Sequence, residues 1–258
     1  MKKELLLDFP VSIGKYQEFL TEIVSLAQKK TSTVICVANV HMYIEAYKSE
    51  KFLGVVNNAE IITPDGQPLT WALRFLYGIK QDRVAGMDLL PDLLKLIEQE
   101  KISAYFYGGT NEILDNTKKF LNDKYPQLNI AGLYSPPFVA YDQISAENTN
   151  KEIVTEINNS VPSIVFVSLG CPKQEKWMSE MKGKINTVMI GIGGALPVMI
   201  GMKKRAPKWM QAYGLEWLYR MMQEPNRLFL RYMSTNFTFI WIIFKNKFLL
   251  LGKKSSEA

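Results

Sequence analysis

Short apolar segments alternate with amphipathic segments along most of the chain, and this alternation constrains the fold more than any other feature. The clearest apolar segments, rich in β-branched or aromatic residues, are Thr33–Val37, Ile102–Tyr107, Ile164–Leu169 and Thr187–Ile192. The amphipathic segments are expected to form helices at about Leu89–Gln99, Glu112–Asn122, Lys151–Asn159 and Gln174–Met181. Strands that alternate with helices predict an α/β fold, with a Rossmann-like parallel or mixed sheet flanked by helices.

Charge divides the chain into two parts. The chain has 31 Lys+Arg and 25 Asp+Glu, a net charge of +6. Residues 1–202 hold 20 basic and 22 acidic residues, so residues 203–258 hold the remaining 11 and 3, and the net charges are −2 and +8. We therefore predict an α/β core over residues 1–202 and a basic, helical C-terminal appendage over residues 203–258. The excess of positive charge fits an anionic partner: nucleic acid, anionic lipid or a phosphorylated substrate.

The appendage carries apolar residues as well as charge. It begins with a hinge at Lys203–Pro207, followed by a helix expected over Trp209–Met222 and by Pro225, which breaks that helix or starts a new one. The apolar runs 237–244 and 248–251 are separated by lysines, and together they fall short of the roughly 18 uninterrupted apolar residues of a transmembrane helix. This pattern favours an interfacial helix on an anionic membrane over nucleic-acid binding.

Composition disfavours several kinds of site. The two cysteines, Cys36 and Cys171, indicate neither a disulfide framework nor a metal cluster. His41 is the one histidine, so a His-rich metal site is excluded, and we interpret it as a structural or capping residue near a strand end. No Asp-x-Asp sequence occurs, so the usual carboxylate pair for a metal on a nucleotide-sugar diphosphate is missing. The N-terminal apolar stretch is too short for a signal peptide, which predicts a cytoplasmic protein.

Ligands of open α/β sheets bind beyond the carboxyl ends of strands, and two loops there carry candidate chemistry. Thr63–Pro68 would hold Asp65 in a proline–glycine turn at a sheet edge, either as a general base for an acceptor hydroxyl or as a turn cap. Tyr107–Asn111 places two glycines before a helix, which fits either a phosphate-binding loop or an ordinary turn capped by Thr110.

Two further loops follow later strands. Gly170–Trp177 carries lysine and amide side chains that could contact phosphate or sugar hydroxyls, while Glu175 could bind a sugar or cap the following helix. Gly191–Pro197 resembles a dinucleotide-binding fingerprint, but Leu196 stands where the third glycine would be needed, so NAD binding is disfavoured. A glycine-lined approach to a ligand and tight sheet–helix packing both remain open for this loop.

Three arginines of the appendage could replace the missing metal. Arg220, Arg227 and Arg231 are spaced by seven and four residues, which places them near one helix face if the helix runs through Pro225 or resumes after it. Guanidinium groups suit diphosphate oxygens, and the same stripe could also face anionic lipid.

These motifs occur in one order along the chain. They are Thr63-Pro64-Asp65-Gly66, Arg83-x-x-Gly86, Tyr107-Gly108-Gly109, Gly170-Cys171-Pro172-Lys173-Gln174-Glu175, Arg205-Ala206-Pro207, Gly214-Leu215-Glu216-Trp217-Leu218-Tyr219-Arg220 and Glu224-Pro225-x-Arg227. Together they resemble the WecG/TagA/CpsF glycosyltransferase family over about residues 5–232. The resemblance implies an inverting, metal-independent and cofactor-free transfer in teichoic-acid, common-antigen or capsule synthesis. The sugar, typically N-acetylmannosamine, passes from a UDP donor to an undecaprenyl-diphosphate-linked sugar.

The resemblance also implies roles for particular residues. Asp65 is the expected general base, and Arg220, with Arg227 and Arg231, is expected to stabilise the leaving diphosphate. The expected substrate-binding residues are Asn39, Gly66, Gln67, Arg83, Gly86, Tyr107, Gly108, Gly109, Gly170, Pro172, Lys173, Gln174, Glu175, Arg205, Arg227 and Arg231. Val37 departs from the family pattern, because many members carry threonine two residues before the asparagine that matches Asn39. The identity of the donor sugar is therefore left open.

The expected partners are a UDP-sugar, a polyprenyl-diphosphate-linked acceptor and an anionic membrane surface, with the protein attached peripherally to the inner face of the cell membrane. Docking on the bilayer is expected to order the appendage and complete the site. The exposed apolar tail is also compatible with a homo-oligomer. The alternative function is a non-catalytic module that binds nucleotide-sugars or lipid-linked glycans at the membrane, which would bind a UDP-sugar without turnover.

Overall fold

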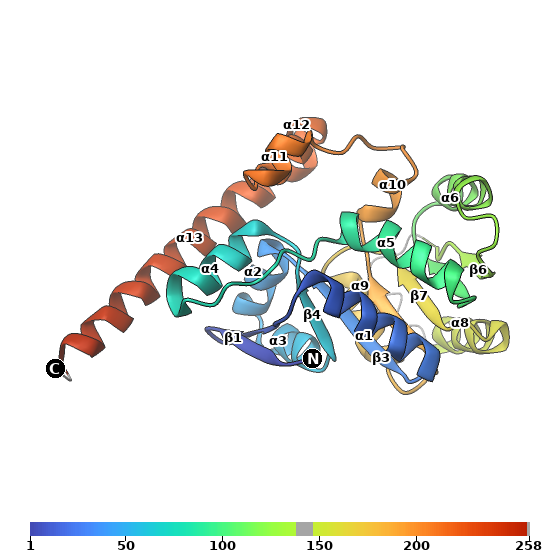
Figure 1. Cartoon of the computed structure of the whole chain (residues 1–258), viewed down its shortest axis with the longest axis horizontal. Coiled ribbons are helices and arrows are strands. Elements are labelled where there is room, and N and C mark those ends of the chain that lie inside the picture. The colour runs from blue at the N-terminus through green and yellow to red at the C-terminus, as the bar shows by residue number, and fades with distance from the viewer. Residues whose placement is uncertain (138–146, 257–258) are drawn as a thin grey trace.

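A six-stranded parallel sheet forms the centre of the protein, shown in Figure 1 from a computed structural model that describes residues 1–137 and 147–256. The strands in spatial order are β4 (Ile61–Pro64), β3 (Thr33–Ala38), β8 (Val188–Gly191), β7 (Ile164–Val167), β5 (Ala104–Tyr107) and β6 (Ile130–Tyr134). Every neighbouring pair is parallel. The predicted α/β fold is confirmed, and the four expected strands correspond to β3, β5, β7 and β8 within a few residues.

A hairpin that the sequence analysis did not predict lies beside the edge strand β4. It consists of β1 (Lys3–Leu6) and β2 (Phe9–Ser12), which pair antiparallel as a separate sheet. The Ser12 hydroxyl accepts a hydrogen bond of 3.0 Å from the Ile62 backbone N–H of β4. The hairpin thereby occupies part of an edge that would otherwise expose unpaired backbone groups.

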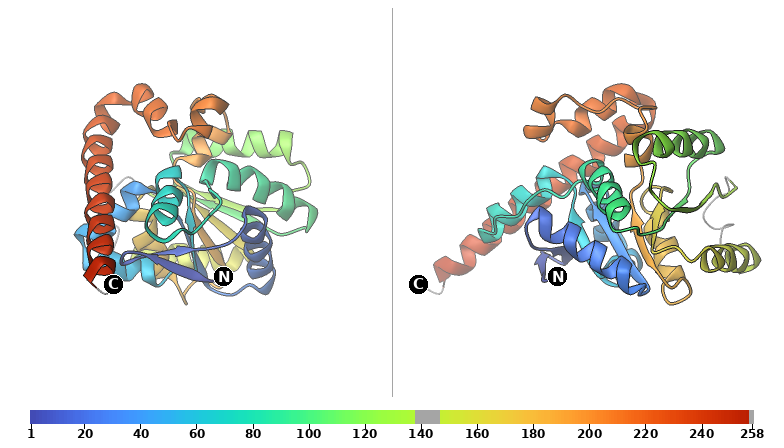
Figure 2. Two further views of the ribbon diagram at one scale, coloured as in Figure 1. Left: turned by 60° about the vertical axis from the view of Figure 1, so that its left-hand side comes forward. Right: turned by 45° about the vertical axis from the view of Figure 1, so that its right-hand side comes forward.

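Helices cover both faces of the sheet (Figure 2). On one face lie α1 (Tyr16–Lys29), α5 (Gly86–Gln99), α6 (Asn111–Lys124) and the short α10 (Ala195–Met199). On the other face lie α2 (Val40–Lys48), α3 (Glu50–Asn57), α4 (Gln67–Tyr77), α8 (Glu147–Ser160) and α9 (Lys173–Met181). Alternate residues of β3 supply the two cores: Val34 and Cys36 contribute to one, and Ile35 and Val37 to the other.

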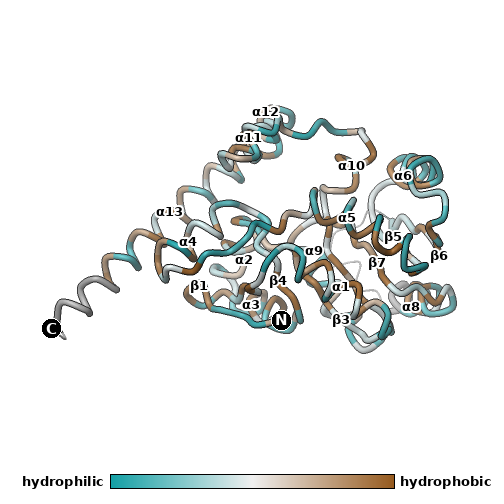
Figure 3. The backbone as a smooth tube through the Cα atoms, viewed as in Figure 1, coloured by the Kyte–Doolittle hydropathy of each residue, from teal (hydrophilic) through white to brown (hydrophobic). Residues whose placement is uncertain are grey.

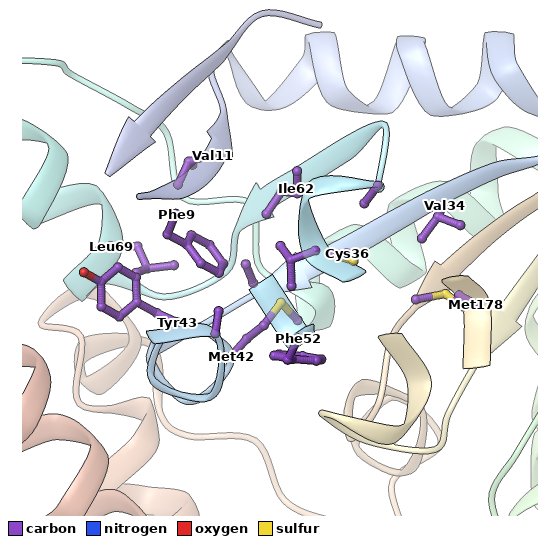
Figure 4. Close-up of a cluster of buried hydrophobic side chains, with 14 of the residues drawn as sticks. Phe9, Val11, Val34, Cys36, Met42, Tyr43, Phe52, Ile62, Leu69 and Met178 are labelled. Atoms are coloured by element: carbon purple, nitrogen blue, oxygen red, sulfur yellow. The ribbon is translucent and has the colours of Figure 1, made fainter. Parts of the chain in front are cut away.

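The core on the α2 face joins the sheet, the hairpin and the C-terminal helix. Figure 4 shows Phe9 of the hairpin near Tyr43 of α2, and their ring centroids are 5.4 Å apart. Tyr43 also meets Phe239 edge to face at 5.0 Å. Aromatic contacts of this geometry add to the effect of burial. The C-terminal helix is therefore part of this core over its middle turns.

The appendage contains three helices, α11 (Lys208–Ala212), α12 (Glu216–Gln223) and α13 (Pro225–Ser256). The prediction of one helix over Trp209–Met222 is wrong, because Gly214 has φ +68° and turns the chain between α11 and α12. The sequence predicted a break or a new helix start at Pro225, and the structure shows a new helix, α13, that begins there. Arg220 therefore lies on α12, whereas Arg227 and Arg231 lie on α13.

Helix α13 has one buried and one exposed apolar face. Phe239, Ile242 and Ile243 are buried against the core, and α13 runs beside α4 and α2 (Figure 1). The exposed apolar side chains of α13 include Phe237, Ile240, Trp241, Phe244 and Phe248. Hydrophobic colour marks the central strands and continues on α13 in Figure 3. Among the described residues, no helix is both long and apolar enough to cross a membrane.

Candidate active site

A cavity of about 340 Å³ lies at the carboxyl ends of β3, β4, β7 and β8, where α12 and α13 also contribute to its wall. Its position agrees with the expectation for open α/β sheets. Twelve of the predicted site residues line it. They are Asn39, Asp65, Gly66, Gln67, Arg83, Gly86, Gly109, Gly170, Gln174, Arg220, Arg227 and Arg231. The fold thus brings together residues from both ends of the chain.

Six predicted site residues do not belong to the cavity lining. They are Tyr107, Gly108, Pro172, Lys173, Glu175 and Arg205. Tyr107 is buried and stacks on Trp177, with ring centroids 4.1 Å apart. Gly108 has φ +104°, and a Cβ there would lie 2.7 Å from the Ser168 carbonyl oxygen. Tyr107 and Gly108 therefore contribute to the packing of the end of β5 against α9 and the loop after β7.

The main chain around Asp65 is fixed by neighbouring strand ends. Its N–H donates to the Ala38 carbonyl at the end of β3, at 2.7 Å. Its side chain accepts a hydrogen bond of 3.1 Å from the Gly86 N–H at the start of α5. The carboxylate therefore does not cap the turn in which Asp65 lies. Gly86 lies close to Val37: a Cβ on Gly86 would be 3.4 Å from Val37 Cγ1, an ordinary van der Waals contact. These two hydrogen bonds hold the Asp65 carboxylate at the cavity wall.

The environment makes the Asp65 carboxylate a stronger base than usual. Burial raises its pKa to about 6, and the nearby Glu216 carboxylate acts in the same direction. Arg83, the Gly86 N–H and Arg220 oppose the shift. At neutral pH the group is ionised but accepts a proton more readily than an exposed aspartate, which suits a general base.

Four charged side chains tie the appendage to the core. Arg83 donates to Glu216 at 2.9 Å and to Asp88 at 2.7 Å. Arg205 donates to the same two carboxylates, at 3.3 Å to Glu216 and 2.6 Å to Asp88. We call Arg83, Asp88, Arg205 and Glu216 the charge cluster. Because each carboxylate joins one arginine of the core and one of the appendage, the charge cluster fixes the start of α12 over the site.

Arg220 lies against the glycine loop after β8. A Cβ on Gly194 would lie 2.7 Å from an Arg220 terminal nitrogen, so the guanidinium rests on the bare backbone there. Gly193 and Gly194 both line the cavity. The Arg220 guanidinium occupies the space that a side chain at Gly194 would need. The interpretation of this loop as a glycine-lined approach to a ligand stays a prediction.

Gln174 fixes the loop after β7 and packs on the same glycine loop. Its Oε1 accepts a hydrogen bond of 3.1 Å from the Gly170 N–H, and its Nε2 donates one of 2.8 Å to the Glu175 carboxylate. A Cβ on Gly191 would lie 2.7 Å from Nε2, so tight packing is observed at this glycine. Glu175 is fully buried, and burial raises its pKa to about 7. This placement leaves Glu175 supporting Gln174 from behind the cavity.

Helix α2 brings His41 to the cavity as well. The N-cap of this helix is Asn39, whose side chain accepts a hydrogen bond of 3.2 Å from the Met42 N–H. His41 is therefore not the capping residue that the sequence analysis considered. His41 lines the cavity instead. Burial lowers its pKa, and the charge of Arg231 lowers it further. Arg231 itself approaches from α13.

Several lining residues were missed by the sequence analysis. They are His41, Lys203, Glu216, Trp217, Tyr232 and Asn236. Glu216 and Trp217 belong to the motif that ends at Arg220, so a signal was present for them. Lys203, Tyr232 and Asn236 carry no local signal, because only the packing of the appendage brings them to the cavity. In residues 1–137 and 147–256, no group of three or more His, Cys, Asp or Glu side chains is placed to hold a metal ion.

Comparison with known proteins agrees with this architecture. The sequence model of the glycosyl transferase WecG/TagA/CpsF family matches residues 5–252. The chain is 32% identical over 207 residues to the N-acetylglucosaminyldiphosphoundecaprenol N-acetyl-beta-D-mannosaminyltransferase of Bacillus spizizenii, covering 80% of this chain and 77% of that protein. The protein of the same name from Bacillus subtilis is 31% identical over 200 residues, covering 77% and 75%. A Staphylococcus aureus relative of that name is 29% identical over 202 residues, covering 78% and 76%.

Proposed function

The chain belongs to the WecG/TagA/CpsF family of glycosyl transferases, and from this premise we propose an inverting, metal-independent hexosyl transfer. The donor is a UDP-sugar, with N-acetylmannosamine or a related hexose as the transferred unit. The acceptor is an undecaprenyl-diphosphate-linked sugar, as the names of the relatives state for those enzymes. The observation that carries the proposal is that Asp65, a buried carboxylate with a raised pKa, lines the same cavity as Arg220.

Asp65 supplies the base of the reaction. Its carboxylate takes the proton of the acceptor hydroxyl while that oxygen forms the new bond to the anomeric carbon. The bond to the UDP oxygen breaks on the opposite face, and the electron pair leaves with the diphosphate. One carboxylate is sufficient, because an inverting displacement has no covalent intermediate. The raised pKa of Asp65, about 6, supports this role.

Arg220 supplies the positive charge that the leaving diphosphate needs. Its guanidinium lies on the glycine loop beside Gly194, and its charge acts on Asp65. Charge that is already in place before the reaction stabilises a developing anion without reorganisation. A fixed guanidinium in this position supports transfer without a divalent metal. Arg227 also lines the cavity, but it forms an ion pair with Glu224 at 2.6 Å.

Val37 bears on the identity of the donor. Its side chain lines the cavity where the family pattern often provides a threonine hydroxyl. A methyl group cannot donate a hydrogen bond to a sugar or a base. The donor is therefore best identified by testing a panel of UDP-sugars.

We further propose that the protein docks peripherally on the anionic, cytoplasmic face of the membrane. The surface that supports this lies on α4 and α13 and includes Trp71, Phe75, Trp241 and Phe244, all at least 42% exposed. Lys247 lies beside it, 5.0 Å from the Phe75 ring centroid. Aromatic side chains with adjacent lysines are typical of helices that lie in the interface of an anionic bilayer.

Flotation with phosphatidylglycerol vesicles tests the membrane proposal. The double variant Trp241→Ser/Phe244→Ser should lose vesicle binding, whereas Val161→Ser, which changes an exposed residue after α8, should not. Equal flotation of all three proteins would contradict it. Transfer that vesicles leave unchanged would contradict the expectation that docking completes the site.

Transfer itself is tested by UDP release in EDTA with a panel of UDP-sugars and a short-chain prenyl-diphosphate-linked N-acetylglucosamine. Asp65→Asn should lower kcat by about 10²–10⁴-fold, the usual contribution of a general base. Asp115→Asn, a change on the exposed side of α6, is the matched control and should retain full activity. UDP binding without turnover of any donor would instead favour the non-catalytic binding module, as would an active Asp65→Asn.

A further inference from the structure

Two buried polar atoms at the α2–α13 side of the cavity have no hydrogen-bond partner among the described residues. They are Nδ1 of His41 and Nε of Arg231. The nearest ionic group to His41 Nδ1 is Oε1 of Glu45, at 3.8 Å, which is beyond hydrogen-bond range. Both residues line the cavity, and the charge of Arg231 acts on His41. Buried polar groups without partners are rare in folded proteins and indicate a missing ligand or solvent.

The cations that line the cavity are not equally compensated. Arg83 is paired with Asp88 and Glu216, and Lys203 and Arg227 both pair with Glu224. Within residues 1–137 and 147–256, Arg220 and Arg231 have no carboxylate within ion-pair distance. The reaction proposed above brings two diphosphates to the site, one on the donor and one on the acceptor. Two arginines outside any ion pair match that requirement.

The two arginines are attached to different walls. Arg220 on α12 rests on Gly194 after β8 and acts electrostatically on Asp65. Arg231 on α13 acts on His41 of α2, and α2 and α13 pack side by side. The donor's leaving phosphate must lie near the reacting carbon and therefore near Asp65. This geometry assigns Arg220 to the donor and leaves Arg231 for the other substrate.

Helix α13 leads from Arg231 to an apolar surface. Tyr232 and Asn236 continue the cavity lining along the helix, and Phe237 and Trp241 follow with side chains 63% and 57% exposed. A prenyl diphosphate has the same order of chemistry, with phosphates at one end and hydrocarbon beyond them. A nucleotide diphosphate lacks the hydrocarbon.

We propose that His41 and Arg231 form a subsite for the diphosphate of the prenyl-linked acceptor, separate from the donor diphosphate at Arg220. Arg231 provides charge and a guanidinium donor. The His41 ring also hydrogen-bonds the Cys171 backbone, and its Nδ1 donates from the opposite wall in the protonated ring, which a bound diphosphate favours. The sequence interpretation grouped Arg231 with the arginines of the leaving group, and the unpartnered atoms favour this different role. The inference rests on the proposed function for the identity of the acceptor.

Binding of farnesyl diphosphate tests the subsite without requiring turnover. It is measured on the full-length protein by titration calorimetry, below the critical micelle concentration of the ligand. Arg231→Ala should weaken farnesyl diphosphate binding by about 10-fold or more, and His41→Asn by a few-fold, as expected for lost charge-assisted and ordinary hydrogen bonds. UDP affinity should change less than about 2-fold in both variants. Lys119→Ala on the exposed part of α6 is the control and should change neither affinity. Saturating UDP should leave farnesyl diphosphate bound.

Several results would overturn the subsite. They are displacement of farnesyl diphosphate by UDP, an equal loss of UDP affinity in Arg231→Ala, no farnesyl diphosphate binding to the wild type, or equal affinity for inorganic diphosphate. Thermal melts verify that each variant is folded, and His41→Asn and Arg231→Lys carry the test if Arg231→Ala is not. Arg231→Lys should restore part of the affinity, because the charge remains. If no UDP-sugar is turned over, the proposed function fails while these binding results still decide the subsite.

Discussion

The loops of the core and the helices of the appendage reach the same cavity, but they are held in different ways. Asp65 is fixed by backbone hydrogen bonds to Ala38 and Gly86, which belong to the sheet exits and the start of α5. Arg220 is positioned by the charge cluster and by its contact with Gly194. The base is therefore built into the sheet, whereas the cations depend on how the appendage packs.

The two regions also differ in charge, at −2 for residues 1–202 and +8 for residues 203–258. Of the arginine and lysine residues that line the cavity, the core supplies Arg83, which pairs with Asp88 and Glu216, whereas the appendage supplies Lys203, Arg220, Arg227 and Arg231. The proposed base, Asp65, belongs to the core. The comparison indicates that the core provides shape and proton transfer while the appendage provides charge stabilisation. The four predictions below test this division, from the largest expected effect to the smallest.

Arg220→Ala tests the contribution of the appendage most directly. Loss of one preorganised donor to a developing anion costs about 10²–10³-fold in kcat. Because the arginine would also contact bound UDP, UDP affinity should fall in this variant, whereas Asp65→Asn should leave UDP affinity nearly unchanged. Transfer assays and UDP titrations measure both effects, with Lys119→Ala as the control. Full activity in Arg220→Ala would contradict the division of roles between core and appendage, because the appendage would then supply no essential charge.

Gly214→Ala tests how the appendage is held. Gly214 has φ +68°, and a Cβ there would lie 2.8 Å from Trp71 Cη2 of α4. The left-handed backbone and the overpacking together should cost about 2–4 kcal/mol of unfolding free energy. Gly201 has φ +79° but open space around a Cβ, so Gly201→Ala should cost only the backbone part, about 1–2 kcal/mol. Urea unfolding measures both, and equal losses would show that α4 does not constrain the turn.

Glu175→Gln tests the core support for the cavity. The pKa of Glu175 in the folded protein is raised to about 7, so the native state binds more protons than the unfolded chain between about pH 4.5 and 7. The wild type should therefore lose stability as pH rises through this window, by roughly 1–3 kcal/mol, and the neutral variant should not. Unfolding midpoints at pH 5 and pH 8 measure the difference. A parallel pH dependence in both proteins would show that another group is responsible.

Glu216→Gln tests the electrostatic link between the two regions, and its shift of the pH profile should be the smallest of the four effects. The Glu216 carboxylate raises the pKa of Asp65, so its neutralisation should lower that pKa. The acidic limb of kcat/KM, expected near pH 6, should move to lower pH by less than about one unit. Glu100→Gln at the exposed end of α5 should leave the limb in place. A shift to higher pH would contradict the assignment of Asp65 as the base.

Much of the core could be predicted from the sequence, because its signals are local. The segments that became β3, β5, β7 and β8 are short and apolar, and the structure places all four in the central sheet. The β1–β2 hairpin was missed, since Lys3–Leu6 and Phe9–Ser12 are only four residues each and their partner at the edge of β4 lies far along the chain. The break at Gly214 was missed because one glycine in an aromatic, helical pattern is a weak signal.

The sequence by itself determined the fold class, the basic appendage and the motif order that marks the family, because each depends on residue type and spacing. Tertiary structure decided which cations remain uncompensated. Arg83 pairs with Glu216 from 133 residues away, whereas Arg220 and Arg231 have no such partner within the described parts of the chain. The same packing brought His41 to Arg231. Ion pairing and desolvation depend on distances of a few ångströms between residues far apart in sequence, and only the folded chain sets those distances.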